Sequence, residues 1–277
     1  TYLLSTPARQ YVMRAKPGPV AQLLPSAHAV EREFRLQSAL AGSAVPVAGM
    51  HCLCEDESVI GRAFYVMDFV EGRIFWEQSL PGMEPSERSA IYAELNRVIA
   101  ALHGVDFAAL GLADYGKAGN YFSRQIDRWT RQYRASETVG IAAMDQLIDW
   151  LPRHIPLEEN PQVSLVHGDY RIDNVIFHPT EPRILAVIDW ELSTLGHPLA
   201  DFAYHMMSWH ITPGGAMRGL GGLDLAALGI PDEPAYIAAY EQRMRRRVAG
   251  DWNFYLAYNL FRIAAILQGV YKRSTEG

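Results

Sequence analysis

The chain has 277 residues, of which 49% are hydrophobic and 11% aromatic, enough to bury the core of one large domain or of two lobes that share an interface. Its net charge is −6 at pH 7, so no overall positive field attracts nucleic acid or an anionic membrane, and neither is an expected partner. No apolar run approaches the ~20 residues that span a bilayer, and the start shows no signal-peptide pattern.

The first elements in chain order are short strands with one helix among them. Apolar and β-branched residues predict strands from Tyr2 to Leu4 and from Gln10 to Arg14, before a break at residues 16–19. A helix is expected from about Ala27 to Leu40, and Glu33 lies beside its apolar face. This alternation is typical of a small β-rich lobe.

Two further strands are expected from His51 to Cys54 and from Ala63 to Val70, the second rich in Phe, Tyr and Val. Cys52 and Cys54 have no second cluster of metal-ligating residues beside them, so we expect buried, reduced thiols. Reduced thiols favour a cytoplasmic protein.

Helical periodicity dominates the rest of the chain, beginning with a helix that Ser86 is expected to cap. Further helices are expected near residues 121–135, 141–151, 199–209, 234–248 and 252–271. One β interruption occupies Val163 to Ile188. The pattern predicts an α+β chain with a small N-terminal lobe, residues 1–70, and a larger, mainly helical lobe, residues 71–277.

The polar segment from His167 to Asn174 connects two of the short strands in this interruption, and a further strand ends at Asp189. If these strands pair as a hairpin, Asp189 lies beside the polar loop. Phosphoryl transfer needs such a set: a carboxylate that accepts the proton of the attacking hydroxyl, and an amide and a second carboxylate that hold Mg²⁺ against the phosphates. We expect Asp169 as the base and Asn174 and Asp189 as the metal ligands.

At these residues the sequence resembles the kinase-like superfamily, in particular its aminoglycoside phosphotransferase and choline kinase branch. The catalytic loop of kinases places an Asn five residues after its Asp, as Asp169 and Asn174 do here. Asp201 stands where this branch has an Asp that supports the loop. The stretches 31–34, 61–67 and 189–194 are most similar to the kinase-like domain fused to acyl-CoA dehydrogenases and to its free-standing bacterial relatives.

The resemblance implies a bilobal protein-kinase-like fold and an ATP site between the lobes. In such kinases a cation on a small-lobe strand contacts the phosphates of ATP and is held by a helix Glu, here Glu33. Arg14 fits the strand position best and Lys16 has the usual residue type, so both stay candidates. Backbone groups of Asp68 and Val70 would meet the adenine. The first strand and glycine-rich turn of the family are expected before Thr1.

The sequence also departs from protein kinases. Gly168 replaces their Arg, and no Ala-Pro-Glu motif follows Asp189, so control by activation-loop phosphorylation is not expected.

Three readings of the function remain open. The resemblance favours a kinase of a hydroxy acid or hydroxyacyl thioester. An aminoglycoside kinase is the alternative, but its polycationic substrate needs clustered carboxylates, and basic residues outnumber acidic ones after Asp201. A nucleotide-binding pseudokinase would lack the base or a metal ligand, whereas Asp169, Asn174 and Asp189 are all present.

Overall fold

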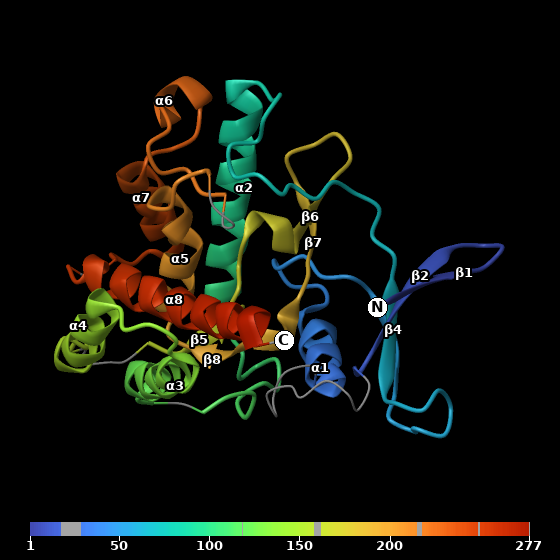
Figure 1. The fold of residues 1–277 in the computed structure, drawn as a ribbon. Helices are drawn as coiled ribbons and strands as arrows, with labels where there is room; N and C mark the ends of the chain where they lie inside the picture. Colours follow the sequence, from blue (N-terminus) through green and yellow to red (C-terminus); the bar gives the residue numbers. More distant parts are fainter. Residues whose placement is uncertain (18–28, 118, 158–161, 215–217, 249, 277) are drawn as a thin grey trace.

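The computed structural model describes residues 1–17, 29–117, 119–157, 162–214, 218–248 and 250–276. A small antiparallel sheet stands apart from a larger body of helices (Figure 1). The sheet has the strand order β1-β2-β4-β3. Its strands are β1 (Tyr2–Ser5), β2 (Gln10–Ala15), β3 (Met50–Cys54) and β4 (Phe64–Asp68).

Helix α1 (Val30–Leu40) lies between the sheet and the helical body (Figure 1). The helix buries residues against both neighbours: Val30 packs with Tyr65 of β4, and Leu36 belongs to the core of the large lobe. Residues 27 and 28, where the sequence places its first turn, lie outside the described residues. Arg32 donates to the carbonyl of Tyr115 at 2.8 Å, which ties α1 to the helical lobe.

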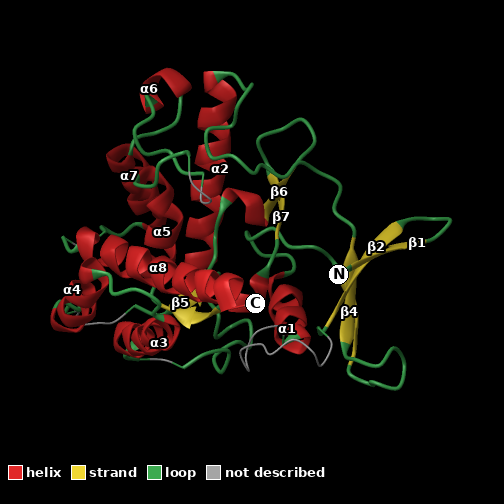
Figure 2. Cartoon of the chain, in the orientation of Figure 1, coloured by secondary structure: helices red, strands yellow, loops and turns green. Residues whose placement is uncertain are grey.

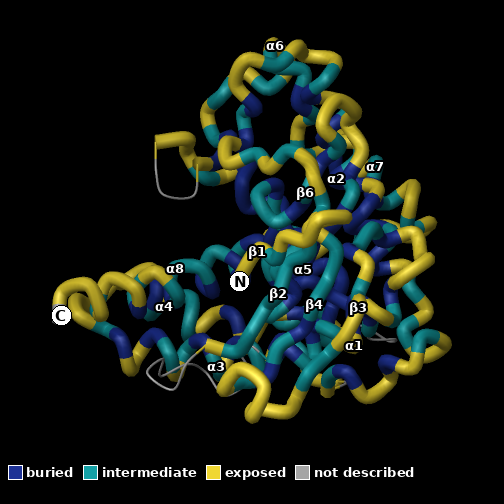
Figure 3. The backbone as a smooth tube through the Cα atoms, turned by 90° about the vertical axis from the view of Figure 1, so that its right-hand side faces the viewer, coloured by how far each residue is buried: buried dark blue, intermediate teal, exposed yellow. Residues whose placement is uncertain are grey.

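The large lobe is mainly helical (Figure 2). Its helices are α2 (Pro85–His103), α3 (Tyr121–Ser136), α4 (Ala142–Trp150), α5 (Pro198–Met206), α6 (Leu225–Leu228), α7 (Glu233–Met244) and α8 (Trp252–Glu276). Single turns of 3₁₀ helix occupy Leu151–Arg153, Ile172–Asn174, Trp190–Leu192 and Met207–Trp209. The inner faces of these helices form the main core, and the free end of α8 extends into solvent (Figure 3).

Four short strands interrupt the helices: β5 (Ser164–Val166), β6 (Val175–Phe177), β7 (Ile184–Val187) and β8 (Thr194–Gly196). β6 and β7 form the predicted antiparallel hairpin. β5 pairs with β8, a three-residue strand that the sequence does not signal. Because β5 and β8 lie side by side, the segment between them begins and ends at the same point of the fold. The polar loop and the hairpin, which both belong to this segment, therefore lie close together.

The connection from the sheet to the large lobe is bonded to this hairpin. Arg73 and Phe177 exchange both of their backbone hydrogen bonds, each at 2.8 Å. A Cβ on Gly72 would lie 2.2 Å from the carbonyl oxygen of Phe177, so only glycine allows the approach.

Two local predictions are wrong. Helix α2 begins at Pro85 with Glu84 at its N-cap, so Ser86 lies inside the first turn, because the fixed φ of proline suits the first helical position. Cys52 and Cys54 are free thiols, as expected, but Cys52 is exposed on a strand at the sheet edge. Among the described helices, none is both long and apolar enough to span a bilayer.

Candidate active site

A cavity of about 550 Å³ lies between the sheet and the β6–β7 hairpin. Five of the predicted site residues line it, namely Arg14, Asp68, Val70, Asn174 and Asp189. Most of its other lining side chains are apolar or aromatic: Val12, Ala48, Tyr65, Met67, Phe69, Ile74, Trp76, Ile176 and Ile188. Apolar side chains therefore predominate in the wall of the cavity, and its charged side chains are Arg14, Asp68, Glu71, Asp173 and Asp189.

The loop after β5 is fixed from within the large lobe by Asp201 of α5. One oxygen of its buried carboxylate accepts from the backbone N–H of His167 and the other from that of Gly168, both at 2.8 Å. His103 of α2 lies 3.2 Å from the same carboxylate. Burial acts to raise the pKa of Asp201, but these hydrogen-bond donors outweigh it and hold the pKa below its ordinary value. The charged form therefore anchors the loop.

His167 and Asn174 both bond to Ile188, the residue before Asp189. The Nε2 atom of His167 donates to the Ile188 carbonyl at 2.9 Å, because its Nδ1 atom accepts from the N–H of Asp169 at 3.2 Å. The N–H of Ile188 in turn donates to the carbonyl of Asn174 at 2.9 Å. The loop and the end of the hairpin are thus joined on two sides. Asn174 and Asp189 line the cavity, and Asp169, which is not part of its wall, is bonded to Asn174.

Both carboxylate oxygens of Asp169 accept hydrogen bonds. The amide of Asn174 donates to Oδ2 at 3.0 Å, and the hydroxyl of Tyr204 donates to Oδ1 at 2.5 Å. Since the nitrogen of the Asn174 side chain faces Asp169, its amide oxygen is directed elsewhere. That oxygen is the atom a divalent cation would bind.

Gly168 is required at its position by the backbone. Its φ is +85°, and a Cβ there would lie 2.7 Å from the carbonyl oxygen of Leu192. The arginine found here in protein kinases cannot fit this close approach. The departure noted in the sequence therefore has a steric reason.

Arg14 of β2 lies at the centre of three carboxylates. Its Nε is 3.1 Å from Glu33 of α1, and its Nη2 is 3.2 Å from both Asp189 and Glu191. Burial would lower the pKa of Arg14, but the surrounding negative charges raise it, so the side chain stays charged. Glu33 is buried, and burial raises its pKa against the effect of Arg14.

Lys16, the other candidate cation, lies elsewhere. Its Nζ is 3.1 Å from Glu31, and it lines a shallower hollow at the end of the sheet rather than the main cavity. The structure thus brings Arg14, and not Lys16, to Glu33.

Asp68 and Val70 lie on the cavity wall as β4 runs into the connection between the lobes. The backbone N–H of Asp68 donates to Gly49 at 2.8 Å, and its side chain accepts from His51 at 2.7 Å. The N–H of Asp68 is therefore already bonded within the sheet and is not available to a nucleotide base in this conformation.

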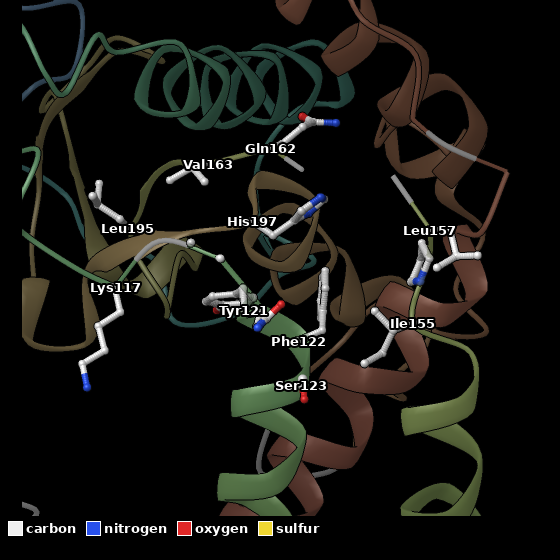
Figure 4. Close-up of a pocket in the computed structure, with 14 residues that line it drawn as sticks. Lys117, Tyr121, Phe122, Ser123, Ile155, Leu157, Gln162, Val163, Leu195 and His197 are labelled. Carbon is white, nitrogen blue, oxygen red and sulfur yellow. The ribbon is translucent and has the colours of Figure 1, made fainter. Parts of the chain in front are cut away.

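A second cavity, of about 270 Å³, opens at the start of α3 (Figure 4). Tyr121 and Phe122 of α3 face Ile155 and His197 across it, and its wall contains none of the predicted site residues. It is separate from the site between the lobes.

Three charged or polar groups of the site were not predicted: Tyr204, Arg262 and the carboxylate of Glu191. Tyr204 follows Asp201 by three residues on one helix, so the two share a face, and this spacing could have indicated it. Arg262 of α8 donates to the carbonyl of Gly168 at 2.6 Å. Nothing local in the sequence marks it, because α8 reaches the loop only through the tertiary fold.

The donor set at Asp189 and Asn174, a carboxylate and an amide oxygen, is of the hard-oxygen type that Mg²⁺ prefers. No group of three or more His, Cys, Asp or Glu residues suited to a metal occurs in the described part of the chain. Two protein ligands fit Mg²⁺ that is also bound by phosphate oxygens and water.

A small sheet lobe, a larger helical lobe and this loop and hairpin between them form a kinase-like fold, the fold of the phosphotransferases with similar solved structures. The chain belongs to the phosphotransferase enzyme family, whose model matches residues 1–248. The predicted resemblance and fold class are therefore confirmed.

Relatives with curated descriptions are longer proteins. Acyl-CoA dehydrogenase family member 10 of Mus musculus is 49% identical over 278 residues, which cover 100% of this chain and 26% of that protein. Acyl-CoA dehydrogenase family member 11 of Homo sapiens is 42% identical, covering 100% of this chain and 35% of the relative. The chain thus spans about a quarter to a third of these proteins.

Solved structures show the same fold. A structure from Ralstonia eutropha, provisionally described as an aminoglycoside phosphotransferase, is 65% identical with a TM-score of 0.92 and covers 99% of this chain and 80% of that one. A thermostable APH(4)-Ia mutant, in complex with AMP-PNP and hygromycin B, has a TM-score of 0.61 at 17% identity and covers 98% and 86%. The ethanolamine kinase of Plasmodium vivax has a TM-score of 0.55 at 11% identity and covers 96% and 75%.

Proposed function

We infer that the protein transfers the γ-phosphate of ATP, with Mg²⁺, to the hydroxyl of a small hydroxy acid or hydroxyacyl thioester. The observation that supports this most is that Asn174 and Asp189 both line the cavity, where Asn174 is bonded to Asp169 and Asp189 is paired with Arg14. A similar structure was solved with an ATP analogue, and the apolar part of the cavity suits an adenine ring.

Each residue has a distinct part in the proposed reaction. Asp169 accepts the proton of the acceptor hydroxyl while the oxygen of that hydroxyl forms a bond to the γ-phosphorus. The bond from the γ-phosphorus to the bridging β-phosphate oxygen breaks and ADP leaves. Arg14, held by Glu33, contacts the phosphates, while Asp68 and Val70 meet the adenine through their backbones. Mg²⁺ on Asn174 and Asp189 would neutralise charge on the phosphates.

The acceptor class rests on charge and on the relatives. Arg171 and Arg262 both act electrostatically on Asp169 and Tyr204, and of the two only Arg171 is paired with a carboxylate, that of Asp173, in the described part of the chain. Such surroundings favour an acceptor with a carboxylate or phosphate and disfavour a polycation. The curated relatives are named as members of an acyl-CoA dehydrogenase family, whose substrates are acyl thioesters.

An aminoglycoside is the second candidate acceptor, because the 65% identical structure has that provisional description. The two candidates differ in charge, so a panel separates them. ATP consumption is measured against hydroxyacyl-CoA thioesters, free hydroxy acids, amino alcohols and aminoglycosides. Turnover confined to the anionic acceptors supports the proposal, and turnover confined to aminoglycosides contradicts it.

Asp169→Asn tests the chemistry. We expect phosphate transfer to fall by roughly 10³-fold or more, because the amide cannot accept the proton, while the affinity for ATP stays close to that of the wild type. Nucleotide affinity is measured by thermal shift with ATP and Mg²⁺. Equal transfer by the wild type and the variant would exclude Asp169 as the base, and no transfer by the wild type with any acceptor would favour a pseudokinase.

A further inference from the structure

Asp169, the base of the proposed reaction, is held by Tyr204, a residue outside the catalytic-loop motif of kinases. The Tyr204 hydroxyl lies 2.5 Å from Oδ1 of Asp169, and the amide of Asn174 holds the other oxygen. A short hydrogen bond to a charged oxygen is stronger than one between neutral groups. The carboxylate is therefore oriented by two donors from two different elements.

Tyr204 is itself fixed. Its side chain is buried on α5, and the guanidinium of Arg262 lies 4.7 Å from the centre of its ring. The same guanidinium donates to the carbonyl of Gly168 at 2.6 Å. Arg262 thus joins the tyrosine to the loop that contains Asp169, by a cation–π contact on one side and a hydrogen bond on the other.

Tyr204 remains a donor at working pH. Burial and the negative charge of Asp169 both raise the pKa of its hydroxyl, so it does not ionise and cannot replace Asp169 as the base. A carboxylate oxygen can accept more than one hydrogen bond, so Oδ1 can still receive the hydroxyl of an acceptor while Tyr204 is bound.

We propose that Tyr204 is a positioning residue that aims the Asp169 carboxylate at the acceptor through this hydrogen bond. The proposal rests on the function proposed above. The proton still passes from the acceptor to Asp169, and Tyr204 keeps its own.

Tyr204→Phe tests the proposal by removing only the hydroxyl. We expect kcat to fall about tenfold, because the carboxylate loses one of its two orienting donors, while the KM for ATP stays within about twofold. Tyr133→Phe, at a buried tyrosine of α3 outside the site, is the matched control and leaves kcat unchanged.

The outcomes separate this inference from the function beneath it. A wild type that phosphorylates no acceptor ends the proposed function. A wild type that turns over, with a kcat that Tyr204→Phe leaves unchanged, ends only the role of Tyr204. A fall in kcat that Tyr133→Phe reproduces, or that comes with an equal change in the KM for ATP, also overturns the role, since a general loss of packing then explains it.

Discussion

The two sides of the cavity between the lobes, which we call the cleft, are held in place in different ways. On the large-lobe side, Asp201 is almost fully buried and binds two backbone N–H groups of the loop. On the small-lobe side, Arg14 is shared among three carboxylates, two of which, Asp189 and Glu191, are 39% and 24% exposed. The loop is therefore held in place by the large lobe itself, whereas under the proposed function Arg14 would exchange carboxylates for phosphates when nucleotide enters.

Asp201→Asn changes the buried carboxylate that holds the loop, and it should lower the free energy of unfolding more than the other substitutions. The variant replaces a charged acceptor by an amide that presents N–H to the N–H groups of His167 or Gly168, so we expect the free energy of unfolding to fall by about 4 kcal/mol, with loss of kcat. Urea unfolding measures the first quantity. Asp232→Asn, at the exposed N-cap of α7, is the control and should cost less than about 0.5 kcal/mol, since Asn caps as well as Asp.

Gly168→Ala tests whether the loop is fixed by its backbone as well. The positive φ and the clash with the carbonyl of Leu192 together predict a loss of about 3 kcal/mol. Gly111→Ala isolates the first contribution, because Gly111 has a φ of +71° and open space around it, and should lose only about 1 kcal/mol. Equal losses in the two variants would show that the contact with Leu192 is unimportant.

Arg14→Met addresses the exposed side and should change affinity more than stability. We expect the KM for ATP to rise about 30-fold, about 2 kcal/mol, with a smaller loss of unfolding free energy than in Asp201→Asn. Lys16→Met is the matched control, since Lys16 faces Glu31 and not the cleft, and should change KM about twofold or less. A larger effect in the Lys16 variant would reverse the assignment of the phosphate-contacting cation.

The sequence predicted the elements whose signals are local. The β6–β7 hairpin and the helices near their expected positions follow from periodicity, and the offset from Asp169 to Asn174 is visible in one short stretch. The pairing of Arg14 with Glu33 was among the expected possibilities, because strand position and helix face are both local features.

What could not be predicted depends on contacts between distant segments. β8 has only three residues and exists because β5 lies beside it. Arg262 meets Gly168 across 94 positions of sequence, and the partner of Tyr204 is known only once α5 lies under the loop. The predicted N-cap of α2, Ser86, is wrong because Pro85 favours the first helical position, which puts the cap at Glu84.

The bonds between Arg73 and Phe177 also determine how the cleft can open. The chain up to Asp68 belongs to the sheet, and from Gly72 onward it is fastened to the hairpin, so in this connection a hinge has residues 69–71 in which to turn. These three residues line the cavity at the end where adenine is proposed to bind. Rotation about this hinge moves the strands near Arg14 farther than it moves Val70, so the base of a nucleotide would stay seated while the phosphate end is uncovered for exchange.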